Sequence, residues 1–319
     1  MTTPTECVNC HASTLSWKEE KWGYTLYECG SCKLQFWWPF KNPGADAYEN
    51  NGRFQARNNH PLGKSLYQQQ KLFLDAYQKP GSTLLDLGIG TGRFLAAAKE
   101  RGYQVTGTDF DSKAVAAAKN VLGLDDVYAM DVETFLKTYP QRKFSIITMF
   151  EVLEHVDSYS FLPYVRNALE TGGYFVISVP NRECWRALLT NEGPPVHLSR
   201  WSAASMKLFL DHHGFRVVSI RKIPVRFDLI ITRFNEWTKG FLSFSLVKKI
   251  ESLTVAGEEK ATPQGPVAPR KATFTMHIVR ALALVKMYVF FFIPASCIYA
   301  YLWLTGRQYQ TLYVTATPK

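Results

Sequence analysis

The sequence lacks the features of a secreted chain and of a repeat protein. Residues Met1 to Val8 contain no basic segment followed by an apolar core, so we expect no secretory signal and predict that the chain folds in the cytosol. No internal repeat is present. Acidic residues are in the minority, at 27 against 37 basic residues, and the net charge of +10 favours anionic partners such as phospholipid headgroups, nucleic acid or phosphorylated substrates. The 319 residues, 46% of them hydrophobic, are enough for one large α/β domain with appendages and exclude a disordered chain.

Cysteine is also scarce, and four of the six cysteines fall into two Cys-x-x-Cys pairs. Cys7 and Cys10 form the first pair, Cys29 and Cys32 form the second, and an 18-residue spacer separates them. In a reducing compartment this spacing is typical of four thiolates around one tetrahedral zinc ion rather than of disulfides. The segment between the pairs is too small to fold without such a cross-link, so we predict a structural zinc ribbon over residues 1–38. Four thiolates leave no open coordination position, which argues against a catalytic zinc ion there.

An alternation of strand and helix patterns follows the ribbon. A predicted linker rich in Asn, Gly and Pro covers Pro39 to Pro61, and a predicted helix over Lys64–Gln78 follows it. We then predict strands over Thr83–Leu87, Gln104–Thr108, Asp126–Ala129, Phe144–Phe150, Gly173–Val179 and Phe215–Ile220. The predicted helices between them cover Arg93–Arg101, Ser112–Leu122, Val132–Tyr139, Tyr159–Thr171 and Ser202–His213. This order indicates an α/β fold with a parallel sheet that helices cover on both faces.

A glycine-rich turn follows the first of these strands. Gly88, Gly90 and Gly92 lie where the strand gives way to a helix, so that the backbone can approach a ligand closely. The spacing is Gly-x-Gly-x-Gly, which differs from the Gly-x-Gly-x-x-Gly that seats a pyrophosphate. Asp86 precedes the turn, and a carboxylate there suits a positively charged ligand better than two phosphates. The turn therefore predicts a cationic ligand.

Two further acids complete this predicted site. Asp109 ends the second strand about twenty residues past the first glycine, a position from which a carboxylate accepts hydrogen bonds from a ribose diol. Asp131 follows the third strand and is placed to accept a hydrogen bond from an adenine amino group. An adenosine with a cationic tail and no phosphate fits this set, and S-adenosylmethionine is such a molecule.

With these residues the sequence resembles the class I S-adenosylmethionine-dependent methyltransferases. The matching residues are Asp86-Leu-Gly-Ile-Gly-Thr-Gly92, Asp109, Asp131 and Phe144 to His155, and the resemblance covers roughly residues 72–220. It implies a Rossmann-like, seven-stranded sheet with the cofactor over the carboxyl ends of the first strands. The alternatives are a Rossmann-like dehydrogenase or nucleotide-sugar enzyme, and a methyltransferase-like scaffold without activity.

Two loops carry candidate catalytic residues. In the segment Glu-Val-Leu-Glu-His after the fourth strand, Glu151 and His155 would share a face of a helical turn, with Glu154 next to His155. Neutral imidazole is well suited to accept a proton near pH 7. The same run is similar to that of quinone-type O-methyltransferases, where it lies at the cofactor and acceptor pocket, although it would equally serve to orient the loop. His197, in a prolyl loop after the fifth strand, is a second candidate base, and that loop resembles one that borders the acceptor site in bacterial methyltransferases.

The last third of the chain contains apolar segments. Met287 to Leu304 is an uncharged run just long enough to suggest a membrane span. However, Tyr309 to Thr317 alternates like the seventh strand of the methyltransferase sheet, so the insert must return to the side that it left. We therefore expect an interfacial or re-entrant segment, together with an amphipathic segment over Phe241–Val255. The alternative is that these segments pack against the sheet or form the arm of a dimer.

The whole sequence predicts a peripheral or monotopic methyltransferase on the cytosolic side of the cell membrane. We expect a ribbon over residues 1–38, a linker and helix over 39–80, a cofactor-binding core over 81–223, a membrane-associating insert over 224–306 and a final strand over 307–319. Residues 241–304 would contact the membrane, nucleic acid is not an expected partner, and a homo-oligomer is left open. An N-terminal zinc ribbon combined with such a loop is similar to methyltransferases of surface-glycan and lipid pathways, which implies O-methylation of a lipid-linked glycan or other amphipathic acceptor. A quinone-type O-methyltransferase and a membrane-anchored binding module with a vestigial cofactor site are the alternatives.

Overall fold

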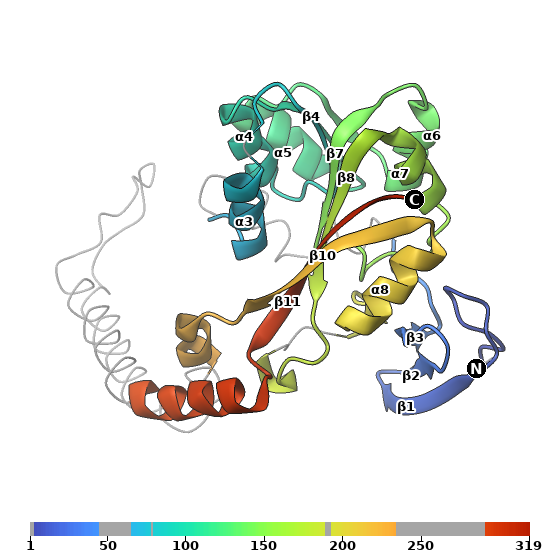
Figure 1. Ribbon diagram of the computed structural model, residues 1–319, viewed down its shortest axis with the longest axis vertical. Coiled ribbons are helices and arrows are strands. Elements are labelled where there is room, and N and C mark those ends of the chain that lie inside the picture. The colour runs from blue at the N-terminus through green and yellow to red at the C-terminus, as the bar shows by residue number, and fades with distance from the viewer. Residues whose placement is uncertain (1–2, 45–64, 78, 189–192, 234–290) are drawn as a thin grey trace, which may run out of the picture. The chain divides into compact units, whose positions relative to one another are not determined.

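The computed structural model describes residues 3–44, 65–77, 79–188, 193–233 and 291–319 (Figure 1). The chain divides into two compact units. The first comprises Met1–Pro224 and Tyr309–Lys319, and the second comprises Val225–Gln308. The domain boundaries expected from the sequence stay predictions.

A seven-stranded mixed sheet forms the centre of the first unit. The strands lie in the order β10 (Phe215–Pro224), β11 (Tyr309–Pro318), β8 (Leu169–Pro180), β7 (Phe144–Phe150), β4 (Thr83–Leu87), β5 (Gln104–Asp109) and β6 (Val127–Ala129). The pairs among β8, β7, β4, β5 and β6 are parallel, and β11 is antiparallel to both of its neighbours. The predicted α/β fold and the predicted seventh strand near the end of the sequence are therefore confirmed.

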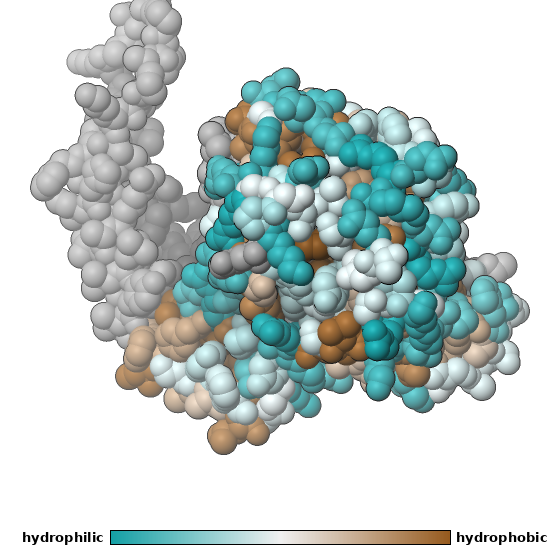
Figure 2. All heavy atoms as spheres, turned by 45° about the horizontal axis from the view of Figure 1, so that its top comes forward, coloured by the Kyte–Doolittle hydropathy of each residue, from teal (hydrophilic) through white to brown (hydrophobic). Residues whose placement is uncertain are grey.

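Helices cover both faces of this sheet (Figure 1). One face packs against α3 (Gln68–Ala76), α4 (Arg93–Glu100) and α5 (Ser112–Leu122), and the other against α6 (Val132–Thr138), α7 (Leu162–Ala168) and α8 (Ala203–His212). Successive strand residues point to opposite faces, so Leu84 belongs to the first core and Leu85 to the second. On the face shown in Figure 2, hydrophilic residues predominate and hydrophobic ones form small, separate groups.

Local signals in the sequence set the ends of these helices. Asp111 caps α5 by accepting hydrogen bonds from the backbone N–H groups of Lys113 and Ala114, and Gly123 ends the helix in the left-handed conformation. Helix α7 is shorter than the predicted Tyr159–Thr171, because the chain enters β8 at Leu169, which pairs with Phe144 of β7. Pairing with a neighbouring strand decides this boundary, and the sequence pattern alone does not show it.

The N-terminal ribbon is part of the first unit. Strands β1 (Leu15–Lys21), β2 (Tyr24–Cys29) and β3 (Gln35–Trp38) form an antiparallel sheet whose fourth strand is β9 (Ser199–Arg200). Phe36 pairs with Ser199, and the backbone N–H of Trp37 donates to the carbonyl of Leu198 (2.8 Å). The buried cysteines and Phe36 belong to the same core as α7 and α8. The ribbon therefore packs on the larger sheet and pairs with the loop that follows β8.

The second unit contains helical residues at 227–233 and 291–305. Phe227 contacts Phe292 and Tyr299, with ring centroids 5.5 and 5.6 Å apart. Several large apolar side chains of residues 291–305 are exposed, among them Ile293 (70%) and Trp303 (53%). Within the described residues, no helix combines the length and the apolar character needed to cross a membrane. The predicted amphipathic segment Phe241–Val255 lies outside the described residues.

Candidate active site

The glycine turn joins β4 to α4 at the carboxyl end of the parallel strands. All three glycines have positive φ angles, of 81° at Gly88, 53° at Gly90 and 73° at Gly92, which is the left-handed region that favours glycine. A Cβ atom on Gly88 would lie 2.5 Å from the Cγ2 atom of Val152, in the loop after β7. The turn therefore needs glycine for its conformation and, at Gly88, for close approach of the neighbouring loop.

Both acids predicted beside this turn lie next to it. The backbone N–H of Gly90 donates to Oδ2 of Asp109 (2.8 Å), and the N–H of Asp111 donates to its Oδ1 (2.9 Å). A carboxylate has about four acceptor positions, so Asp109 retains capacity for a diol. Asp86 is fully buried and accepts a hydrogen bond from the Thr148 hydroxyl (2.7 Å).

The electrostatics of Asp86 favour a positively charged ligand. The pKa of Asp86 is raised to about 7, chiefly by burial; the hydrogen bond from Thr148 opposes this shift and the nearby charge of Asp109 adds to it. A cation bound near these two carboxylates would stabilise their charged forms. The donor set thus fits the sulfonium and ammonium groups of S-adenosylmethionine, with Asp109 as the diol acceptor, and does not fit a pyrophosphate.

The structure gives Asp131 a local role at the start of α6. Its Oδ1 accepts a hydrogen bond from the backbone N–H of Thr134 (2.9 Å), and its Oδ2 accepts one from the Thr134 hydroxyl (2.6 Å). The residue is exposed. Asp131 therefore caps the helix, and its contact with adenine stays a prediction.

Glu151 and His155 both lie in the loop between β7 and α7, yet their side chains have different neighbours. The segment forms a tight turn with Glu151 at a φ of 57°, and it is not the helical turn considered from sequence. Oε1 of Glu151 accepts hydrogen bonds from the Ser178 hydroxyl (2.8 Å) and from Nε2 of Gln69 in α3 (3.2 Å). Sequence reasoning missed Gln69 and Ser178, because no local spacing connects them to Glu151.

His155 instead lies beside His197 and Glu154. The two imidazole centroids are 4.5 Å apart with their planes perpendicular, and Nε2 of His155 lies 3.9 Å from Oε1 of Glu154. One ligand atom from each of the three residues lies within 4.8 Å of the others. The structure therefore brings together the two candidate bases, which are 42 positions apart in the sequence, and adds Glu154 to them.

Backbone hydrogen bonds hold the two loops in this arrangement. The carbonyl of Glu154 accepts from the N–H groups of Leu198 (2.7 Å) and Ser199 (3.3 Å), and Nδ1 of His155 donates to the carbonyl of Val196 (2.9 Å). The Leu198 carbonyl in turn accepts from Trp37 of β3. The ribbon and the histidine loops thus form one continuous hydrogen-bonded structure.

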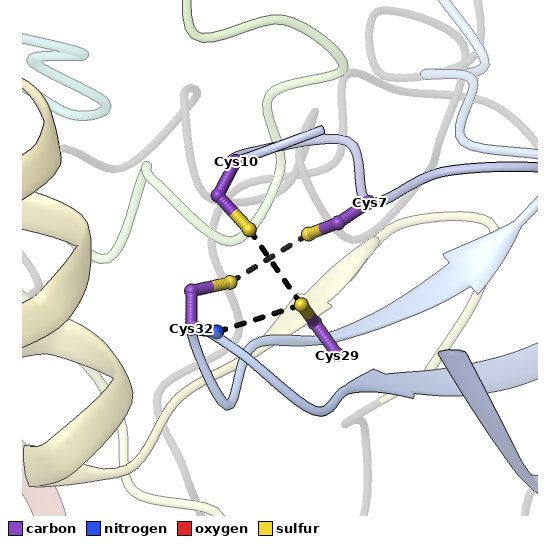
Figure 3. A group of neighbouring side chains, drawn as sticks. All are labelled: Cys7, Cys10, Cys29 and Cys32. Carbon is purple, nitrogen blue, oxygen red and sulfur yellow. Dashed lines mark hydrogen bonds between the residues drawn. The ribbon is translucent and has the colours of Figure 1, made fainter. Parts of the chain in front are cut away.

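The four cysteines of the ribbon point toward a common centre (Figure 3). The Sγ atoms of Cys7 and Cys32 are 3.6 Å apart, as are those of Cys10 and Cys29. Tetrahedral zinc–thiolate bonds of about 2.3 Å place sulfur atoms about 3.8 Å apart, so the observed spacing fits zinc and is far too long for disulfides. The backbone N–H groups of Asn9 and Cys32 donate to the sulfurs of Cys7 and Cys29, which would stabilise the thiolates.

Comparison with known proteins agrees with this geometry. Residues 59–220 match the family described as a methyltransferase domain, which is about half of the chain. A ubiquinone biosynthesis O-methyltransferase of Idiomarina loihiensis is 33% identical over 108 residues, which cover 32% of this chain and 44% of the relative. The chain thus spans less than half the length of that curated relative.

Two solved structures share the fold at low sequence identity. A SAM-dependent methyltransferase from Archaeoglobus fulgidus has a TM-score of 0.50 at 17% identity, covering 83% of this chain and 99% of that one. The 4+2 cyclase SpnF also has a TM-score of 0.50 at 17% identity, covering 86% of this chain and 95% of that one. These likenesses show the fold alone. From the family match, the sheet order and the carboxylates at the glycine turn, the chain belongs to the class I S-adenosylmethionine-dependent methyltransferases.

Proposed function

We propose that the protein transfers the methyl group of S-adenosylmethionine to an oxygen atom of an amphipathic acceptor at the cytosolic face of a membrane. The observation that carries this proposal is the pair of imidazoles: His155 lies in the loop whose Val152 approaches Gly88, and His197 packs against the ring of His155. When bound, S-adenosylmethionine supplies an electrophilic methyl group. The residues of the chain then have to orient the acceptor, exclude water and accept the proton of its hydroxyl group.

Either imidazole is suited to the last of these tasks. A neutral imidazole accepts a proton near pH 7, and His155 keeps its Nε2 lone pair because its Nδ1 donates to Val196. His197 lies against the ring of His155 and reaches the same space. Glu154 is placed to stabilise the positive charge that either ring acquires.

Two classes of acceptor follow from different observations. The combination of a ribbon and a prolyl loop supports a lipid-linked glycan, by analogy alone. The relatives named ubiquinone biosynthesis O-methyltransferase support an isoprenoid aromatic hydroxyl group. Both acceptors are amphipathic, and they differ in whether the reacting oxygen belongs to an aromatic ring or to a sugar.

The test is to incubate the purified full chain with S-adenosylmethionine carrying a labelled methyl group and with each acceptor class in detergent micelles. The expected result is label in one lipid product, identified by mass. Calorimetry on the same sample separates the enzyme from a binding module with a vestigial site: failure of folded protein to bind S-adenosylmethionine would contradict the proposal for both acceptors.

We also propose that the four cysteines hold a structural zinc ion. All four sulfurs lie within 4.8 Å of one another, and three of the four residues are buried. The expected result is one tightly held zinc ion per chain by elemental mass spectrometry, reduced to background in a Cys29→Ser variant. Zinc retained in that variant at the level of the unaltered chain would contradict the assignment.

Contact with a membrane is proposed for residues 241–304. The support is the group of exposed apolar side chains at residues 291–305 and the eight basic residues between Arg216 and Lys249. We expect the full chain to sediment with vesicles containing anionic lipid, and expect a variant with Ile293→Ser and Trp303→Ser to sediment less. Equal sedimentation of both proteins would exclude these side chains from the contact.

A further inference from the structure

We propose that Glu154, His155 and His197 form a binding site for a divalent transition-metal cation at the acceptor side of the active site. One ligand atom from each residue lies within 4.8 Å of the other two. The three residues come from two loops, after β7 and before β9, that hydrogen bonds hold together. The proposal deepens the proposed methyl transfer and rests on it for its chemical role, although the binding of the cation is tested independently.

The tautomer of His155 is set for metal binding. Its Nδ1 donates a hydrogen bond to the carbonyl of Val196 (2.9 Å), because a carbonyl oxygen can only accept. The neutral ring then carries its lone pair on Nε2. That atom is the one that lies 3.9 Å from Oε1 of Glu154. A metal-ligating histidine commonly donates its other N–H to a carbonyl or carboxylate, and His155 has this arrangement.

The burial of Glu154 provides a second, independent argument. Its side chain is 1% exposed, whereas that of His155 is 22% exposed. A divalent cation would favour the charged form of this buried carboxylate. It could reach the carboxylate from the side of the two imidazoles, which are the more accessible members of the group. Since the Glu154 carbonyl also accepts from Leu198 and Ser199, the backbone that carries this side chain is held to the segment that carries His197.

The kind of cation follows from the number and type of ligands. Two nitrogen atoms and one oxygen atom suit zinc or another first-row divalent ion, whereas magnesium and calcium prefer oxygen ligands. Bonds of about 2.0–2.2 Å require neighbouring ligand atoms about 3.3–3.5 Å apart in a tetrahedron, so the group has to contract on binding. Three protein ligands leave at least one position open, which is the arrangement of catalytic rather than structural sites.

The open position would take the acceptor oxygen. A bound cation lowers the pKa of a hydroxyl group, so its proton leaves to water and the oxygen keeps the electron pair. That pair then forms the bond to the methyl carbon while the carbon–sulfur bond breaks and its electrons pass to sulfur, leaving a neutral thioether. With the cation in place, His155 and His197 hold the ion, and neither has to take the proton.

The test uses the full chain with its thiolate site already loaded with zinc, titrated with Co²⁺ as the probe. The expected result is one further equivalent of Co²⁺ with visible d–d absorption but without the near-ultraviolet charge-transfer band of a cobalt–thiolate bond. His197→Ala should weaken this binding about tenfold to hundredfold. Glu154→Gln, which keeps the shape of the side chain, should do the same, and His212→Ala, an exposed histidine of α8, should not.

The outcomes separate this proposal from the proposed function. No further equivalent of Co²⁺, or binding that is unchanged in His197→Ala, would overturn the cation site. Because Glu154 is buried, the His197→Ala variant decides the question if Glu154→Gln fails to fold. Calorimetry with S-adenosylmethionine on the same samples reports on the cofactor site. If the unaltered chain binds the cofactor but not Co²⁺, only the cation site is rejected. If the unaltered chain does not bind the cofactor, the proposed methyl transfer is rejected.

Discussion

The four-cysteine cluster and the Glu154–His155–His197 group both direct side chains toward a common centre, but they differ in the number of ligand atoms that they offer to an ion. We call the four-cysteine cluster the closed site and the group of three residues the open site. Four sulfurs fill every position of a tetrahedral ion, so the cluster can stabilise the ribbon and has no position for a substrate. The second group provides three ligand atoms and keeps two imidazoles partly accessible. From this difference we infer that the four cysteines would contribute to folding and the second group to chemistry.

The two sets are nevertheless connected. Strand β3 of the ribbon pairs with β9, and the loop between β8 and β9 carries His197. The hydrogen bonds from Trp37 to Leu198 and from Leu198 to Glu154 link the ribbon to the histidine loops in two steps. We therefore infer that the closed site holds the open one in position, and that damage to the two sites should have different consequences.

The largest effect should come from removing one of the four cysteines of the closed site. We expect Cys7→Ser to abolish tight zinc binding and to lower the free energy of unfolding by about 4 kcal/mol or more, equivalent to a fall in Tm of about 10 °C. Cys7 is fully buried in the core that the ribbon shares with α8. Thermal unfolding followed by circular dichroism measures the change. Cys297→Ser, at an exposed cysteine, is the control. An equal loss of stability in both variants would contradict the structural role of the four-cysteine cluster.

The next effect should come from the open site and should leave the fold unchanged. His197→Ala is expected to reduce kcat about a hundredfold or more, because the acceptor oxygen loses the group that helps to remove its proton. Its Tm should stay within about 2 °C of that of the unaltered chain, since the side chain is only half-buried. Initial rates with a labelled methyl donor and a thermal melt give both values. A large loss of stability with unchanged kcat would assign His197 to the fold instead.

A smaller effect is expected at the glycine turn. Asp109→Ala should weaken binding of S-adenosylmethionine about tenfold to hundredfold, because it removes the diol acceptor and the carboxylate that holds the N–H of Gly90. Calorimetry measures the Kd. Asp125→Ala, at a side chain that is 96% exposed, provides the matched control for loss of one negative charge. If the two variants bound S-adenosylmethionine with equal affinity, Asp109 would not be a ligand of the cofactor.

The sequence predicts a part of the fold or of a site well where the residues that determine it lie close together in the sequence. The strand Thr83–Leu87, the strand Phe144–Phe150 and the helix Ser112–Leu122 match their predicted bounds, because apolar periodicity and caps act over a few residues. The four cysteines could be grouped from spacing alone, and the structure places them together. The glycine turn and Asp109 likewise adjoin, as the strand order implies for carboxyl ends of neighbouring parallel strands.

The composition of the open site could not be predicted in the same way. Glu151 was expected to share a face with His155, but the loop turns instead of forming a helix, and Glu151 contacts Gln69 and Ser178. The approach of His197 to His155 depends on the pairing of β3 with β9, between segments that are more than 160 positions apart. Such pairing is a property of the folded chain, and no local pattern of residues encodes it.

The smallest effect should be a change in the affinity for S-adenosylmethionine with pH, and it tests the charge of Asp86 beside the glycine turn directly. Asp86 has its pKa raised to about 7 by burial, so the folded apo protein binds a proton there that the unfolded chain gives up near pH 4. The stability this adds is complete below pH 4 and declines as the pH rises to about 7. A bound cation favours the charged carboxylate, so affinity for S-adenosylmethionine should increase from pH 6 to pH 7, by at most about tenfold, and level off above it. Calorimetry in buffers of different ionisation enthalpy counts the proton released on binding. Asp86→Asn should flatten the profile, and a flat profile in the unaltered chain would mean that the cationic groups of the donor lie away from Asp86.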